Sequence, residues 1–419
     1  MPLKAPELLA PAGSLDKLRY ALAFGADAVY AGIPRYALRA RNNSFSLEAL
    51  AAGIDTAHQQ NRKLYLTVNI FAHQAKLKTF ISDLAPIVAL QPDAFIMADP
   101  GLIWLVRERW PQMPLHLSVQ ANTVNAAAVR FWQAAGIRRV ILSRELSLAQ
   151  IEDIRQQCPD MELEVFVHGA LCIAWSGRCL LSGYFNHRDA NQGVCTNSCR
   201  WHYRLLPDPD QDHTAWVLEE GKRPGAYLPI EEDEHGTYIL NAKDLCAIEY
   251  VEQLARIGVD SLKIEGRTKS AWYVARAVLA YRQAIDTAQQ GLPLASATVA
   301  LLDGLAHRGY TPGFLERHAP QDLQNYATGD SLPGNRHYVG EVLAQESGQL
   351  RIEVKNRFAV GDSLELMTPT GCHTFRLDSL HDVRSGAPLN VAPGSGWQVK
   401  IPDPQPHPLE YALLARIPV

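Results

Sequence analysis

The chain has 419 residues, of which 47% are hydrophobic and 20% are charged, a composition typical of globular proteins with a large core. No run of about 18 apolar residues and no basic-then-apolar N-terminus is present, so we expect neither a membrane span nor a secretory signal, and a cytoplasmic location. The net charge of −4 excludes general electrostatic attraction to nucleic acid, so RNA binding would need a local basic patch.

The first two thirds of the chain repeat a short apolar run followed by an amphipathic stretch. Ser14 can cap a helix over 15–24 that Gly25 ends, and 271–290 has one apolar helical face. The runs are rich in Val, Ile, Leu and Tyr, as buried parallel strands are. We expect strands at 7–11, 28–32, 63–69, 94–98, 114–120, 139–143, 162–168 and 261–265. Eight such units predict an α/β fold, a (β/α)8 TIM-like barrel, with a doubly wound open sheet as the alternative.

Composition divides the chain into a barrel at 1–316, a linker at 317–335 and a second domain at 336–419. An insertion at about 170–240 interrupts the barrel. Its second half is acidic and rich in Pro and Gly, which predicts a surface loop, and a helix is expected to begin near Asp244. Short alternating segments with turn residues between them predict a small C-terminal antiparallel β-barrel domain, or a sandwich. These segments are 338–343, 349–354, 363–367, 372–377 and 397–401.

Four of the seven cysteines lie close together in the insertion: Cys172, Cys179, Cys195 and Cys199. Thiolates are soft ligands that suit zinc and iron–sulfur clusters. A four-iron cluster takes four cysteines, whereas structural zinc favours pairs two to four residues apart. The first pair is too wide for that, so the spacing favours an iron–sulfur cluster and leaves zinc or unligated thiols as alternatives.

Polar side chains follow several predicted strands, at the end where barrel enzymes place their chemistry. Arginine binds carboxylates and phosphates in bidentate fashion, although ion pairs with Glu7, Glu145 and Glu265 are the alternative. The candidates for substrate binding are Arg41, Asn69, Gln120, Asn122, Arg144 and Arg267.

Four further residues at the same end are candidates for catalysis. Lys263 and Glu265 have the same parity on their strand, so both can point into the barrel, either as a catalytic or as a structural pair. His168 precedes the first clustered cysteine and is either a proton donor, a neighbour of the cluster or a structural residue. Glu145 completes the set.

Several stretches resemble peptidase family U32, the collagenase-like peptidases. Residues 164–182 (EVFVHGALCIAWSGRCLLS) are similar to the family signature, and 7–13 (ELLAPAG) and 25–32 (GADAVYAG) to its opening blocks. Members that hydroxylate tRNA are similar at further stretches, and the resemblance covers nearly the whole chain. These stretches are 35–43, 117–122, 142–147, 191–200, 262–269 and 307–310.

The resemblance implies a tRNA-modifying enzyme. It would form 5-hydroxyuridine at the wobble position, the first step toward 5-carboxymethoxyuridine, in a prephenate-dependent reaction. The implied partners are the anticodon loop of tRNA and this small dicarboxylate. The implied cofactor is a 4Fe-4S cluster on Cys172, Cys179, Cys195 and Cys199, with Cys246 as a substitute for the fourth ligand. A peptidase, as the family name suggests, and a non-catalytic tRNA-binding factor are the alternatives.

Overall fold

The computed structural model describes residues 3–38, 45–171, 196, 198, 203–207, 216–220, 224–225, 227–230, 232–233, 236–237, 243–316, 333–404 and 409–418. Within these ranges no helix has both the length and the apolar character needed to cross a bilayer.

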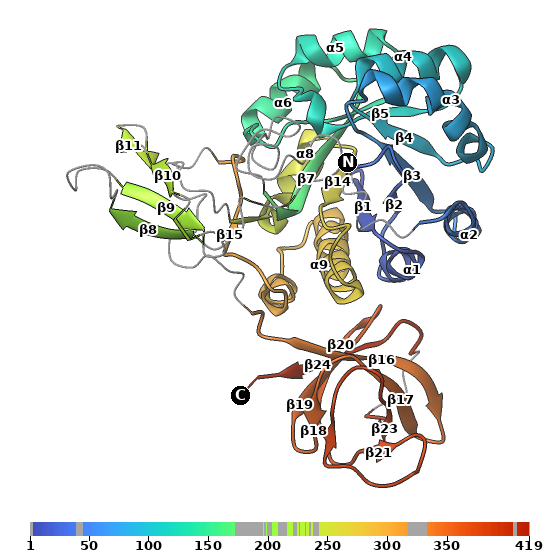
Figure 1. The fold of residues 1–419 in the computed structure, drawn as a ribbon, viewed down its shortest axis with the longest axis vertical. Helices are drawn as coiled ribbons and strands as arrows, with labels where there is room; N and C mark the ends of the chain where they lie inside the picture. Colours follow the sequence, from blue (N-terminus) through green and yellow to red (C-terminus); the bar gives the residue numbers. More distant parts are fainter. Residues whose placement is uncertain are drawn as a thin grey trace.

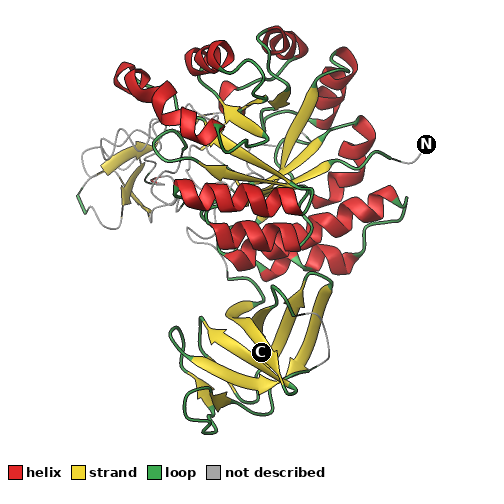
Figure 2. Ribbon diagram, turned by 90° about the vertical axis from the view of Figure 1, so that its right-hand side faces the viewer, coloured by secondary structure: helices red, strands yellow, loops and turns green. Residues whose placement is uncertain are grey.

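Eight parallel strands close into a barrel surrounded by helices (Figures 1 and 2). The order around the ring is β14-β1-β2-β3-β4-β5-β6-β7, and β14 pairs with β7 to close it. The TIM-like barrel is therefore confirmed over the open sheet. The strands are β1 (Glu7–Ala12), β2 (Ala28–Gly32), β3 (Lys63–Val68), β4 (Ala94–Met97), β5 (Leu115–Leu117), β6 (Arg139–Ile141), β7 (Glu162–Ala170) and β14 (Ser261–Ile264).

The helices begin where local capping groups allow it. Ser14 accepts a hydrogen bond from the Lys17 N–H, and Ser147 forms a capping box with Gln150. The α-helices of the barrel are α1 (Leu15–Ala23), α2 (Leu47–Gln59), α3 (Gln74–Val88), α4 (Pro100–Arg109), α5 (Ala126–Ala134), α6 (Leu148–Gln157), α8 (Val251–Ile257), α9 (Ala271–Gln289) and α10 (Ser296–Ala300). Short 3-10 helices join them within the described ranges, among them η2 (Val119–Ala121), η5 (Ile248–Tyr250) and η6 (Leu302–Gly304).

Two short strands extend the sheet beyond β7. β13 (Asp244–Cys246) pairs antiparallel with the end of β7, and β15 (Tyr310–Thr311) pairs parallel with β13. The helix predicted to begin near Asp244 is therefore wrong in its start, since α8 begins at Val251. Pairing with distant segments sets this conformation, and local sequence does not reveal it.

The described part of the insertion contains strands where a surface loop was predicted. β8 (Tyr203–Pro207), β9 (Trp216–Glu220) and β10 (Tyr227–Ile230) form an antiparallel sheet, and β11 (Glu232–Asp233) pairs with β12 (Gly236–Thr237). The acidic, Pro- and Gly-rich composition of the segment concealed short β-prone runs such as Trp216–Leu218.

The C-terminal region is antiparallel, as predicted, and its sheet curls around a core of its own (Figure 1). The strands of the larger sheet follow the order β20-β19-β24-β16-β17-β23-β21. They are β16 (His337–Glu346), β17 (Gln349–Val354), β19 (Ser363–Thr368), β20 (Gly371–Arg376), β21 (His381–Asp382), β23 (Gln398–Pro402) and β24 (Leu413–Ile417). A second, two-stranded sheet joins β18 (Phe358–Ala359) to β22 (Val391–Ala392).

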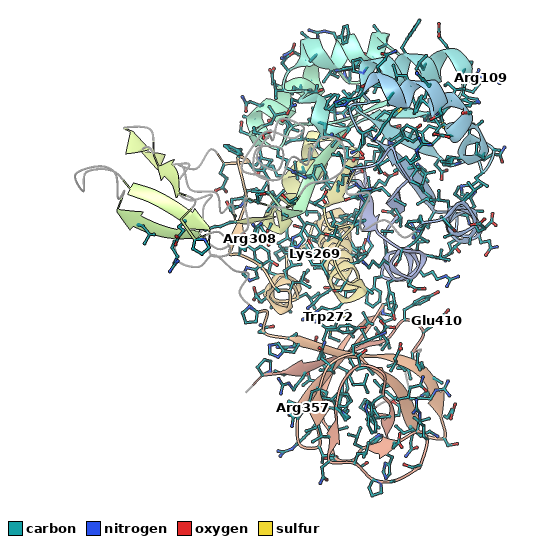
Figure 3. The ribbon with its side chains drawn as sticks, in the orientation of Figure 1. Arg109, Lys269, Trp272, Arg308, Arg357 and Glu410 are labelled. Atoms are coloured by element: carbon teal, nitrogen blue, oxygen red, sulfur yellow. The ribbon has the colours of Figure 1, made fainter. Side chains whose placement is uncertain are left out.

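The two domains share a packed interface. Arg276 of α9 is buried and forms an ion pair with Glu365 of β19, which also accepts from Arg336 at 2.9 Å. Trp272 stacks on Tyr338 with 5.8 Å between ring centroids, and Figure 3 shows Trp272 where α9 meets the C-terminal sheet. A buried ion pair and stacked rings fix one arrangement of the domains.

Candidate active site at the barrel mouth

Five side chains from four strands and their following loops meet inside the barrel near the carboxyl ends of the strands. We call Tyr30, Arg144, Phe166, Lys263 and Glu265 the mouth cluster. The Arg144 guanidinium lies over the Phe166 ring, 4.0 Å from its centroid, and 3.9 Å from the Glu265 carboxylate. The Tyr30 hydroxyl donates to the Ile264 carbonyl at 3.0 Å and lies 3.4 Å from Glu265 Oε2. Lys263 Nζ is 4.4 Å from the Tyr30 ring centroid.

Lys263 connects this cluster to a deeper group of charges, Glu7, Tyr65, Arg139 and Glu164, which we call the floor network. Lys263 Nζ donates to Glu164 at 2.8 Å, and both side chains are buried. Burial lowers the pKa of Lys263, against the attraction of Glu164. The shared inward parity predicted for Lys263 and Glu265 agrees with these contacts, since both approach Tyr30.

Arg267 and Asn69 both contact the backbone of one residue, Leu38, in the loop after β2. Asn69 Oδ1 accepts from the Leu38 N–H at 3.1 Å, and Arg267 donates to the Leu38 carbonyl at 2.7 Å. Arg267 also donates to Thr67 Oγ1 at 2.9 Å. These contacts hold the start of the loop that carries Arg41, which itself lies outside the described residues.

Gln120 and Asn122 lie in the loop after β5, in and next to η2. Gln120 is 2% exposed, and its Oε1 accepts from the Ser118 hydroxyl at 3.1 Å. Asn122 adopts a left-handed backbone conformation with φ of 50° and donates to the Gln120 carbonyl at 2.8 Å. The local turn is therefore tightly held, while the Gln120 amide nitrogen has no hydrogen-bond partner.

Glu145 lies in the loop after β6, where it accepts a short hydrogen bond from Ser143 Oγ. The Ser143 N–H donates to the Thr123 carbonyl at 3.1 Å, which ties this loop to the loop after β5. Of the candidates, the structure thus places Arg144 and Glu265 in direct contact, and Gln120 and Glu145 in adjoining loops.

His168 lies against residues of α9 and β15. Its ring packs near Tyr273, Tyr281 and Tyr310, with centroids 5.5–5.8 Å apart, and is 1% exposed. Burial lowers the pKa of His168 to about 3, so the ring is neutral at neutral pH. The pairing of β7 with β14 shifts register between Lys263 and Ile264, and such a bulge re-aims the following side chains.

All four clustered cysteines lie outside the described residues, so the ligand set stays a prediction. The described chain reaches Leu171, through Gly169 at a φ of 105°, where a side chain would clash with the Glu265 carbonyl. This glycine lets the strand pass close to the mouth cluster just before Cys172. Cys246 lies beside His168 on β13, and burial raises the pKa of its thiol to about 11. Across the described ranges, no three His, Cys, Asp or Glu residues are grouped to hold a metal ion.

Sequence reasoning missed three residues that build the site: Tyr30, Glu164 and Phe166. Glu164 and Phe166 share parity on β7, and a glutamate in an otherwise apolar barrel strand was the available signal. Tyr30 stood within an apolar run that predicted a buried strand, with no feature that set it apart.

A family model for peptidase family U32 matches residues 13–325, and one for the peptidase family U32 C-terminal domain matches residues 335–416. The chain is 54% identical to tRNA hydroxylation protein P of Escherichia coli, over 98% of this chain and 96% of that protein. It is 50% identical to the protein of the same name from Haemophilus influenzae, with the same coverage. It is also 30% identical to the 23S rRNA 5-hydroxycytidine C2501 synthase of Escherichia coli, over 94% of this chain and 60% of that protein.

Proposed function

This chain belongs to peptidase family U32, and from that membership we propose that it is a hydroxylase that modifies tRNA. The observation that carries the proposal is the match, along nearly the whole chain, to proteins named for tRNA hydroxylation. The more distant similarity to an rRNA 5-hydroxycytidine synthase supports the same chemistry, hydroxylation of a pyrimidine in RNA. We further propose uridine at the wobble position as the target and prephenate as the co-substrate.

The mouth cluster suits a flat, polar substrate. Proteins that act on single bases of RNA unstack them and place them against aromatic rings and guanidinium planes. Arg144 over Phe166 is such a plane, held at one edge by Glu265. Arg144 and Glu265 are each 13% exposed, so a base entering the mouth would reach them with little solvent between.

The proposed cofactor is a 4Fe-4S cluster on Cys172, Cys179, Cys195 and Cys199, with zinc as the alternative. Replacing the C5–H of uridine by C5–OH is a two-electron oxidation that needs an oxygen source and an electron acceptor from outside the protein, and a bound cluster would supply electron transfer to that acceptor. The residues of this chain would orient the base and exclude water. Gly169 brings the strand that leads to Cys172 against Glu265, which supports a site shared by the cysteines and the mouth cluster.

Mass spectrometry of tRNA nucleosides from a gene-deletion strain tests the proposed activity. We expect 5-hydroxyuridine-derived nucleosides to disappear and to return when the wild-type gene is restored. The Cys179→Ala variant should not restore them, whereas Cys372→Ala, at an exposed cysteine of β20, should do so fully. Unchanged tRNA together with lost cleavage of a protein substrate would indicate a peptidase, and full restoration by Cys179→Ala would indicate a non-catalytic binder.

Metal analysis tests the cofactor independently of activity. Protein purified without oxygen should be brown and contain about four irons per chain. The Cys179→Ala variant should lose iron, while Cys372→Ala keeps it. A colourless protein with one tightly held zinc would contradict the cluster.

A further inference from the structure

The loop between β5 and α5, residues 118–125, contains two buried polar atoms without a partner. They are the amide nitrogen of Gln120 and the hydroxyl oxygen of Thr123, in side chains that are 2% and 1% exposed. Buried polar groups are nearly always hydrogen-bonded, because an unmade bond is costly in a dry environment. Two such atoms in one loop therefore point to a ligand that pairs with them.

The Gln120 amide lies at the edge of the barrel interior. His116 of β5 faces the interior, where its ring packs on Tyr65 at 4.7 Å between centroids. Ser118 is two residues further along with extended backbone, so it faces the same way. Since Gln120 Oε1 is bonded to the Ser118 hydroxyl, the amide lies there too.

The same loop adjoins the mouth cluster. The Ser143 N–H donates to the Thr123 carbonyl at 3.1 Å, and the next residue is Arg144. The loop that contains the unpaired atoms of Gln120 and Thr123 is thus hydrogen-bonded to the loop that carries the Arg144 guanidinium over Phe166.

The chemistry of this wall suits a neutral acceptor. The charged groups of the mouth cluster already have partners, Arg144 with Glu265 and Lys263 with Glu164. What remains is an amide donor and a hydroxyl. Ser118 directs its proton to Oε1 and accepts weakly from the Gln120 backbone N–H at 3.5 Å, so the NH₂ group is the part of the Gln120 side chain that has no partner. A ring carbonyl matches that donor, and uracil has a carbonyl where cytosine has an amino group.

We propose that Gln120 is a specificity-determining residue that donates a hydrogen bond to a carbonyl of the target uracil, with the Thr123 hydroxyl beside it. The inference rests on the proposed tRNA hydroxylation and adds the group that distinguishes uridine from cytidine. The same amide could instead bind a carboxylate, and the binding experiment below distinguishes this alternative from recognition of the uracil carbonyl.

The test measures binding of two anticodon stem-loop RNAs, with uridine or cytidine at the wobble position, to the full-length protein by fluorescence anisotropy. Wild-type protein should prefer the uridine RNA by about tenfold, the effect of one good base-edge contact. Gln120→Glu presents only acceptors and should abolish or reverse the preference. Gln133→Glu makes the same change at an exposed position of α5 and should keep it.

Gln120→Met provides a second variant, which removes the unpaired amide nitrogen together with the acceptor of the Ser118 hydroxyl, so circular dichroism is recorded to check that it folds. Its preference for the uridine RNA should fall to about twofold or less. An unchanged preference in both Gln120 variants, or no preference in the wild type, overturns the inference. The first of these results is the one expected if Gln120 binds a carboxylate and not the base. If deletion of the gene leaves the modified nucleosides of tRNA unchanged, the proposed function fails, independently of the result for Gln120.

Discussion

The floor network and the mouth of the barrel solve the same problem, polar groups inside a closed sheet, in opposite ways. In the floor network, Arg139 donates to Glu7 at 2.5 Å and to Glu164 at 3.2 Å, and Tyr65 donates to Glu7 at 2.8 Å. At the mouth, Arg144 and Glu265 are 3.9 Å apart and Gln120 keeps an unpaired donor. The dense hydrogen bonding among the floor residues serves stability, and the sparser bonding at the carboxyl ends of the strands leaves groups for a substrate.

Removing the central cation of the floor should have the largest effect. Arg139→Met leaves Glu7 and Glu164 buried without their main partner, which should lower the free energy of unfolding by about 3–5 kcal/mol. Urea denaturation followed by circular dichroism measures it. The neighbouring Arg138→Met is the control, because Arg138 is 68% exposed and its ion pair with Glu162 should contribute about 0–1 kcal/mol. Equal losses of unfolding free energy in the two variants would show that burial of the Arg139 ion pairs adds nothing to stability.

A methyl group at Gly169 tests how tightly the end of β7 approaches the mouth. Gly169→Ala combines a left-handed backbone with a clash against the Glu265 carbonyl, so we expect a loss of about 3 kcal/mol. Gly348→Ala has the same backbone strain with φ of 75° but open space around it, and should lose about 1 kcal/mol. Thermal unfolding of both variants checks the difference, and matching values would rule out a close approach to Glu265.

The pH dependence of stability probes His168, which is buried without a charge. The unfolded chain takes up a proton as the pH falls through 6.5, while the folded protein stays neutral there until about pH 3. Stability is therefore lost as the pH falls through this window, by about 2 kcal/mol at pH 5. His168→Phe should remove that part of the decline between pH 7 and pH 5, measured by urea denaturation.

The exposed His73 supplies the matched control for this comparison. His73→Phe should leave the decline as in the wild type, because that ring stays in solvent when the chain folds. Burial also lowers the pKa of His116, so a residual decline should persist in the His168 variant. An unaltered decline in His168→Phe would mean that its ring is protonated in the folded state.

The barrel was predictable because each of its strands is a short apolar run in a repeating unit, a signal that is local in the sequence. β24 was not predicted, and its burial explains why. Leu413 and Ala415 pack in the core shared with the barrel, while Leu414 packs in the C-terminal core. A strand that is buried on both faces shows no alternation, so the pattern that located β16, β17, β19, β20 and β23 was missing.

The site was predictable only where parity decides the direction of a side chain. Lys263 and Glu265 approach Tyr30 from one strand, as their spacing indicated. His168 stands on an equally regular run, yet it lies among tyrosines of α9 and β15, because the pairing of β7 with β14 shifts register just before it. The pairing that makes a bulge depends on a second strand distant in the sequence, so the run itself holds no sign of it.

Arg144→Met should have the smallest effect on stability and the clearest effect on function. Its contacts, one ring and one carboxylate at 3.9 Å, should contribute about 1 kcal/mol or less to the free energy of unfolding. Without the guanidinium plane, restoration of 5-hydroxyuridine-derived nucleosides in the deletion strain should fall at least about tenfold, the effect of losing one stacking contact. Nucleoside mass spectrometry and urea denaturation, run beside Arg139→Met at equal protein abundance, compare the two arginines. If Arg144→Met unfolds as readily as Arg139→Met, or restores modification fully, the mouth cluster stabilises the fold as the floor network does and is not a substrate site.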